Sequence, residues 1–172
     1  MTLLTAPAHA DPTRSDQWHL RNLQISDAHI ISTGNGVIVG IIDTGVSPHV
    51  DLRRNLLLGT DIKQQNGSNG QRDRYGHGTE MAGLIAAHGR NGHGVLGIAP
   101  SAKILPVRIT NAIGEAGSLD IAAGISWAAT HSAKIINVSA VSGPTLALKD
   151  AVGIASNNDV LVVAGTGNKP HT

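Results

Sequence analysis

Two glycine-flanked motifs carry the residue types of a nucleophilic catalytic centre. Asp43 directly follows the apolar segment Gly40-Ile41-Ile42, and His77 lies in Tyr75-Gly76-His77-Gly78-Thr79. Because a carboxylate at the end of a buried segment needs a partner, we expect Asp43 to contact His77. Such a pair fixes the tautomer of the imidazole and leaves its other ring nitrogen free to accept a proton. Either residue alone would more simply cap a turn or a helix, but the two motifs together favour acid–base chemistry.

Two further polar residues follow apolar segments and could complete such a site. Ser139 follows Ile135–Val138, and Asn168 lies on a Gly-Thr-Gly turn after Val160–Ala164. In an open α/β sheet, ligands bind outside the carboxyl ends of the strands, so Asp43, Ser139 and Asn168 should share one edge. An amide such as that of Asn168 can donate to a developing oxyanion, and the loss of such a donor typically costs ~10²–10³ in turnover.

The elements that must position these residues alternate along the chain. Four segments are apolar almost residue by residue, as strands covered on both faces are: Val37–Ile42, Ile104–Ile109, Ile135–Val138 and Val160–Ala164. Three stretches have helical spacing: Thr79–His88 with Gly89 as its C-cap, Leu119–His131, and a helix from Pro144 towards Asn157. Strands that alternate with helices predict an α/β fold with a parallel sheet, and the glycine-rich stretch Gly89–Gly94 is predicted to be a surface loop.

The composition restricts the class of protein. The 172 residues are enough for one domain, contain no cysteine and carry a net charge of +1. Cysteine nucleophiles and thiolate zinc sites are therefore excluded, and the scattered basic residues argue against a nucleic-acid partner. No apolar run approaches the ~20 residues that a membrane span needs, so no span is expected in this chain.

The N-terminal residues differ in pattern from the rest of the chain. The apolar segment Leu3–Ala10 ends in Ala8-His9-Ala10, a small-x-small pattern typical of a secretory cleavage site. Residues 1–16 are therefore predicted to be a signal-like segment or a disordered tail, and residues 17–172 to form the domain.

At four places the chain resembles the subtilisin-like serine proteases. Val39–Val46 is similar to the catalytic-aspartate block of that family, and His77–Gly83 to its catalytic-histidine block. Gly94–Pro100 is similar to the segment after the histidine helix, and Val162–Asn168 to the block of the oxyanion asparagine. The opening Gln17-Trp18-His19-Leu20 resembles secreted actinobacterial members of the mycosin type. The resemblance implies a three-layer α/β fold, here without its C-terminal part, and a secreted or cell-surface location.

The resemblance also implies catalytic roles, residue by residue. Asp43 corresponds to the orienting acid, His77 to the general base and Asn168 to the oxyanion donor of a serine endopeptidase that cleaves peptides or proteins. The order aspartate, histidine, asparagine agrees with this family and not with the chymotrypsin order.

Substrate-binding residues follow in the same way. The resemblance implies that Ser139 lies on the strand that pairs with the substrate backbone, and that Gly165 and Gly167 line the pocket for the side chain before the scissile bond. Where the family has Ser-Leu-Gly-Gly-Pro, this chain has Ser139-Ala140-Val141-Ser142-Gly143-Pro144, with one residue more. Substrate pairing and pocket shape are therefore expected to differ from those of the family.

The nucleophilic serine of the family has no counterpart in these 172 residues. It belongs to a Gly-Thr-Ser-Met-Ala block, and neither Gly-Thr-Ser nor Gly-x-Ser-x-Gly occurs in the chain. Ser118, Ser132 and Ser156 are predicted in or beside helices, without the strained turn that exposes a nucleophile. We therefore expect the chain to be inactive by itself and to need a missing C-terminal half as its partner.

Other functions stay open on the sequence. A non-catalytic fragment or pseudoenzyme that binds a partner would carry the same motifs. Nine histidines, and Glu80 three positions after His77, suggest a metal-dependent hydrolase, but the His-Glu-x-x-His spacing is absent because position 81 is methionine. No metal or cofactor is required for the predicted chemistry. The resemblance leaves calcium open, with Asp51 and Asn91 as candidate oxygen ligands.

Overall fold

A five-stranded parallel sheet forms the centre of the computed structural model, which describes residues 11–64, 68–111 and 114–165. Across the sheet the strands are β2 (Thr60–Asp61), β5 (Lys103–Arg108), β1 (Ile38–Asp43), β6 (Ile135–Val138) and β7 (Leu161–Ala164). The four apolar segments of the sequence form β1, β5, β6 and β7, and their parallel pairing is confirmed. The two-residue strand β2 lies at the edge, where no apolar run predicts it.

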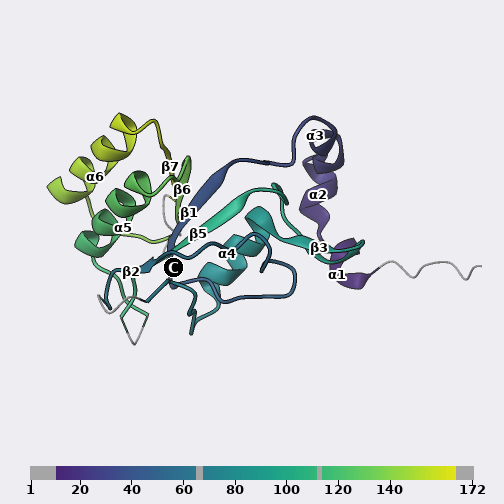
Figure 1. Ribbon diagram of the computed structural model, residues 1–172, viewed down its shortest axis with the longest axis horizontal. Coiled ribbons are helices and arrows are strands. Elements are labelled where there is room, and N and C mark those ends of the chain that lie inside the picture. The colour runs from purple at the N-terminus through teal and green to yellow at the C-terminus, as the bar shows by residue number, and fades with distance from the viewer. Residues whose placement is uncertain (1–10, 65–67, 112–113, 166–172) are drawn as a thin grey trace, which may run out of the picture.

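Helices cover both faces of the sheet, so the three-layer α/β architecture is confirmed (Figure 1). Helices α5 (Ser118–Thr130) and α6 (Leu146–Asn157) lie on one face, and α4 (His77–Ala86) packs against β1 and β5 on the other. Two neighbouring residues of β1 serve the two cores, since Ile42 packs in the cluster of α5 and Ile41 in that of α4. Successive side chains of a strand point to opposite faces, so a single apolar run supplies both layers.

The strand order indicates at which edge of the sheet a binding crevice lies. β5 lies on one side of β1, and β6, the next strand of the sheet along the chain, lies on the other side. Such a reversal is a topological switch point, where a crevice opens outside the carboxyl ends of the strands. Asp43 is the last residue of β1 and therefore lies at this crevice.

The two later helices occur close to their predicted positions. α5 occupies Ser118–Thr130, next to the predicted Leu119–His131. α6 begins at Leu146 and not at Pro144, because the Thr145 side chain caps it by accepting the N–H of Leu148 at 3.3 Å.

The end of α4 corrects a predicted boundary. The helix ends at Ala86 rather than His88, and Ala87 is already extended, with φ −62° and ψ 131°. The N–H of His88 donates to the carbonyl of Asp51 at 2.7 Å, a long-range bond that replaces another helical turn. Gly89 is therefore not a helix cap.

The segment predicted as a surface loop is a hairpin. β3 (His88–Arg90) pairs antiparallel with β4 (His93–Leu96), where the sequence predicts the loop Gly89–Gly94. Gly89 and Gly94 have φ values of +62° and +70°, which other residues rarely adopt. The predicted loop is thus reduced to the exposed turn at Asn91 and Gly92, with a short strand on either side.

Three short helices form one end of the molecule: α1 (Pro12–Ser15), α2 (Trp18–Asn22) and α3 (Ile25–Ile31) (Figure 1). Residues 11–16, the end of the predicted tail, form α1 and its flanks. The reason is a contact across the chain, since Arg14 Nε donates to the carbonyl of Gly94 at 3.0 Å. Residues 1–10 lie outside the described residues. None of the described helices has the length and apolar character to cross a membrane.

Two helical glycines offer a matched test of how α5 packs on the sheet. A Cβ at Gly124 of α5 would lie 3.0 Å from the side chains of Ile109 and Ile42, whereas a Cβ at Gly153 of α6 meets nothing within 4 Å. We expect Gly153→Ala to raise the free energy of unfolding by about 0.8–1 kcal/mol, because alanine favours helix. Gly124→Ala should cancel or reverse this gain, because overpacking typically costs about 1–3 kcal/mol. Urea denaturation measures both, and equal gains in the two variants would contradict the tight packing of α5.

Candidate active site

The structure brings together the two residues that the sequence pairs. Asp43 is 4% exposed at the end of β1, and His77 is the first residue of α4. His77 Nδ1 lies 2.8 Å from Asp43 Oδ1 and 2.9 Å from Oδ2. The N–H of Thr44 also donates to Oδ1, at 2.7 Å. The buried carboxylate is therefore matched by donors, and the imidazole, with 48% of its side chain exposed, faces outwards.

The environment of His77 favours its charged form. The hydrogen bond that His77 donates to Asp43 raises the pKa of the imidazole above its ordinary value of 6.5, while partial burial lowers it less. The nearby carboxylates of Glu80 and Asp73 add to the rise. A raised pKa makes His77 a stronger proton acceptor, as a general base requires.

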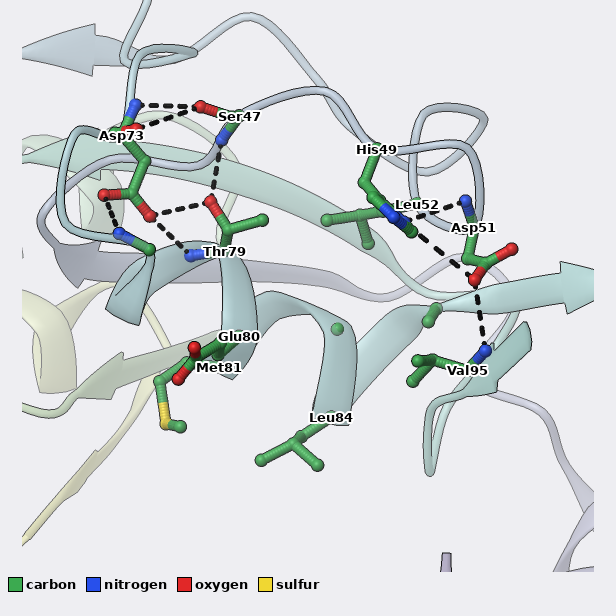
Figure 2. A pocket seen from close by; sticks show the side chains of 13 residues that line it. Ser47, His49, Asp51, Leu52, Asp73, Thr79, Glu80, Met81, Leu84 and Val95 are labelled. Atoms are coloured by element: carbon green, nitrogen blue, oxygen red, sulfur yellow. Dashed lines mark hydrogen bonds and ion pairs between the residues drawn. The ribbon is translucent and has the colours of Figure 1, made fainter. Parts of the chain in front are cut away.

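A second carboxylate, which the sequence does not single out, organises the start of α4. Asp73 Oδ2 accepts the N–H and the hydroxyl of Thr79 at 2.9 and 2.7 Å, as Figure 2 shows. Its Oδ1 accepts the hydroxyl of Thr44 at 2.8 Å and the N–H of Gly76 at 2.9 Å. These bonds place an anion at the N-terminus of α4, where the helix dipole favours it. The only local signal in the sequence is an acidic residue shortly before a predicted helix.

Two opposing effects set the pKa of Asp73. Burial alone would raise it, but the hydrogen bonds from Thr79, Gly76 and Thr44 outweigh burial and lower the pKa below 3.8. Asp73 is therefore ionised wherever His77 titrates, and it acts as a fixed acceptor for the helix start.

The close approach of the two motifs depends on a glycine. A Cβ at Gly78 would lie 2.1 Å from the carbonyl oxygen of Gly45 and 3.1 Å from the Cβ of Asp43. The N–H of Gly78 donates to the hydroxyl of Thr44 at 3.0 Å, which ties α4 to the end of β1. Any side chain at position 78 would force His77 away from Asp43.

A cavity of about 350 Å³ opens in front of the pair. Asp43, His77 and Ser139 all line it. Ser139 follows β6 and accepts a hydrogen bond from the side-chain amide of Asn137 at 2.8 Å. The sequence-predicted residues Asp43, His77 and Ser139 thus share one site, at the carboxyl edge of the sheet.

Of the three predicted site residues after β7, only Gly165 belongs to the described part of the chain. Gly165 follows β7, and its N–H donates to the carbonyl of Val138 at 3.2 Å, which places it beside the chain leading to Ser139. Asn168 and Gly167, the predicted oxyanion donor and second pocket glycine, lie outside the described residues.

A larger cavity, of about 680 Å³, lies on the outer side of α4 (Figure 2). Its wall includes Thr79, Glu80, Met81 and Leu84 but neither Asp43 nor His77. Within the described ranges, no three His, Asp or Glu side chains converge to form a metal site.

A family model and several known proteins match most of the chain. The model of the Subtilase family matches residues 34–172. Subtilisin Savinase from Lederbergia lenta is 40% identical over 157 residues, which are 90% of this chain and 56% of that protein. Thermitase from Thermoactinomyces vulgaris is 38% identical over 162 residues, which are 92% of this chain and 57% of that protein. The chain thus spans about half the length of the curated relatives that it matches.

Solved structures agree with the sequence relatives. A protease from Pseudoalteromonas arctica PAMC 21717 superposes with a TM-score of 0.82 at 32% identity, over 92% of this chain and 59% of that one. MycP1 from Mycobacterium smegmatis gives 0.79 at 27% identity, over 90% of this chain and 46% of that one. MycP1 is among the structural neighbours, while Subtilisin Savinase shares the higher sequence identity with this chain.

The charge of Asp43 should control the titration of His77. We expect Asp43→Asn to lower the pKa of His77 towards 6.5, because the amide no longer stabilises the imidazolium. In the wild type, the stabilisation from this pair is fully present below pH 6.5 and is lost as the pH rises through the higher folded-state pKa; the variant should lack it. NMR titration of the histidines measures the shift. Asp150→Asn, on the exposed side of α6, is the control that should leave the pKa of His77 unchanged.

The charge of Asp73 should matter for the stability of α4. We expect Asp73→Asn to lower the free energy of unfolding by about 2 kcal/mol, the scale of hydrogen bonds to a charged group. Because its folded-state pKa is lowered, the contribution of Asp73 is present above pH 3.8 and is lost as the pH falls through that lower value. Chemical denaturation at pH 7 and at pH 3 tests both statements, with the exposed Asp159→Asn as the control. An unchanged stability at pH 7 would contradict the assigned role.

Proposed function

This chain belongs to the subtilase family of serine proteases, and we propose on that premise that it is the part of a serine-type endopeptidase that carries the acid and the base. The observation that carries the proposal is the contact of His77 Nδ1 with both oxygens of the buried Asp43. His77 is half exposed towards a cavity, and its Nε2 forms no hydrogen bond with a described residue. The free nitrogen is therefore available to a hydroxyl group.

In the proposed reaction, His77 acts as base and then as acid. Nε2 takes the proton of a serine hydroxyl as its oxygen attacks the carbonyl carbon of a peptide bond. Asp43 holds the ring by accepting its Nδ1–H and stabilises the imidazolium that forms. His77 then donates the proton to the leaving amine. The raised pKa of His77 supports this role.

The substrate is proposed to lie along the carboxyl edge of the sheet. Ser139 lines the cavity of the catalytic pair, so the chain after β6 can pair with an extended peptide backbone. Gly165 is exposed, and a Cβ added there would meet nothing within 4 Å, which leaves room for a substrate side chain. Gly167 and Asn168, as second pocket glycine and oxyanion donor, complete the proposal on the strength of the family resemblance. The additional residue in Ser139–Pro144 should give this chain its own substrate preference.

The nucleophile is proposed to come from polypeptide outside these 172 residues. No Gly-Thr-Ser block occurs in the chain, and it spans about half the length of its relatives. The alternative is a non-catalytic fragment or pseudoenzyme that keeps the fold and binds a partner. The two hypotheses predict different results when polypeptide with the missing serine is supplied. Activity should then appear for the endopeptidase part but not for the non-catalytic alternative.

An incompletely covered face of the sheet supports the need for more polypeptide. Helix α4 covers β1 and β5, but beside it an apolar cavity of about 310 Å³ is walled by residues such as Ile85, Ile135 and Val163. Leu161 and Val163 on β7 are 61% and 47% exposed. Contiguous apolar surface of this kind usually marks a contact site. We propose that the polypeptide with the serine covers this face.

The name of one relative supports a proposal about location. One of them is named an extracellular protease, from Bacillus subtilis, and is 34% identical over 155 residues. We propose that the protein acts outside the cytoplasm, secreted or at the cell surface.

Covalent labelling with a fluorophosphonate tests the proposal. The chain alone should give no adduct, whereas a single-chain fusion to a subtilase C-terminal half with a Gly-Thr-Ser-Met-Ala block should be labelled. His77→Ala in that fusion should slow labelling at least ~10²-fold, because the general base is lost.

The labelling is read by intact mass. An adduct on the chain alone would show that one of its own serines is the nucleophile. A folded fusion that stays unlabelled would favour the non-catalytic alternative.

A further inference from the structure

The calcium site that the resemblance leaves open can be tested against the contacts of Asp51. This residue is 2% exposed, so its charge must be compensated inside the protein. Arg90 Nε donates to Asp51 Oδ1 at 2.7 Å, and the N–H of Val95 donates to Oδ2 at 3.1 Å, the contact with Val95 being visible in Figure 2. Both carboxylate oxygens are thus engaged by donors of the hairpin β3–β4. Asn91, the other candidate ligand, has an exposed side chain.

The carbonyl groups of the same hairpin are also occupied. Arg14 donates from Nε to the carbonyl of Gly94 at 3.0 Å and from Nη2 to that of His93 at 3.2 Å. Carbonyl oxygens of a tight loop are the neutral ligands that calcium prefers. Here a guanidinium group from α1 takes them.

Two glycines of the hairpin pack closely against these groups. A Cβ at Gly94 would lie 2.3 Å from Asp51 Oδ2, and a Cβ at Gly89 would lie 2.3 Å from Arg14 Nη2. A side chain at either position would therefore displace the carboxylate of Asp51 or the guanidinium group of Arg14.

The local charges balance without a metal ion. Asp51 and Asp11 supply two negative charges, and Arg90 and Arg14 supply two positive ones. The carboxylate of Asp11 accepts the N–H of Gly94, which holds α1 and the hairpin together. Gln17 adds neutral bonds to the main chain of Leu96, at 2.8 and 2.9 Å.

We propose that Arg14 and Arg90 take the place of a bound cation, so that the hairpin β3–β4 is fixed by two guanidinium groups of the chain itself and binds no calcium. The residues present do not fit a calcium site, in contrast to what the resemblance leaves open. The hairpin is instead held by the segment that includes Asp11, Arg14 and Gln17, which makes α1 a structural part of the domain. This assignment does not depend on the proposed peptidase function.

Hydrogen–deuterium exchange of the peptides that cover residues 88–96 tests the proposal in the full chain. In the wild type, exchange should be the same in 1 mM CaCl₂ and in EDTA. Arg14→Gln and Arg90→Gln should each speed exchange in this segment about tenfold or more, because each removes charged hydrogen bonds. Arg53→Gln is the matched control, because Arg53 is exposed and lies two positions after Asp51. Exchange in this variant should be like that of the wild type.

Equilibrium dialysis with radioactive calcium gives an independent measurement. No saturable binding to the wild-type chain is expected below 1 mM calcium. Saturable binding, or a calcium-dependent slowing of exchange in residues 88–96, would overturn the proposal. Exchange in both arginine variants at the wild-type rate would overturn it as well, because the guanidinium groups would then not hold the hairpin.

Discussion

A carboxylate at the inner end of a central strand is costly unless donors meet it, and much of this structure can be understood from how Asp43 is satisfied. One donor, the N–H of Thr44, is local, and the other is the imidazole of His77 at the start of α4. To bring that imidazole within reach, α4 must begin against β1. Gly78 makes the approach possible, since a side chain there would meet Gly45. The buried charge and the position of the helix are therefore one constraint.

Thr44 links this constraint to a second carboxylate. Its N–H donates to Asp43, its hydroxyl donates to Asp73, and the same hydroxyl accepts the N–H of Gly78. Asp73 in turn holds Thr79 in the first turn of α4. The two acids have different roles. Asp43 contacts the imidazole directly, whereas Asp73 fixes the backbone that carries it. Both negative charges also lie where they favour a protonated His77.

The sequence predicts best what depends on neighbouring residues. Apolar runs locate the main strands of the sheet, and their carboxyl ends locate Asp43 and Ser139, because parallel strands end at one edge. The hairpin β3–β4 and the docked α1 escape prediction, since they depend on pairs such as Arg14 with Gly94, which are 80 positions apart. Asp73 escapes for another reason, because it contacts mainly backbone N–H groups and hydroxyls that no motif identifies. The role of Asn168 stays a prediction.

Helix α4 carries the imidazole at one end and runs into the hairpin at the other. Its 10 residues span about 15 Å, and an α-helix of this length transmits displacement with little bending. The bond from the N–H of His88 to the carbonyl of Asp51 anchors the chain just past the far end. The helix is therefore held at both ends, by the contact of His77 with Asp43 and by the bond from His88 to Asp51. Movement of the chain at Asp51 and His88 would therefore shift the imidazole of His77 relative to Asp43, so residues far from this pair help to set its geometry.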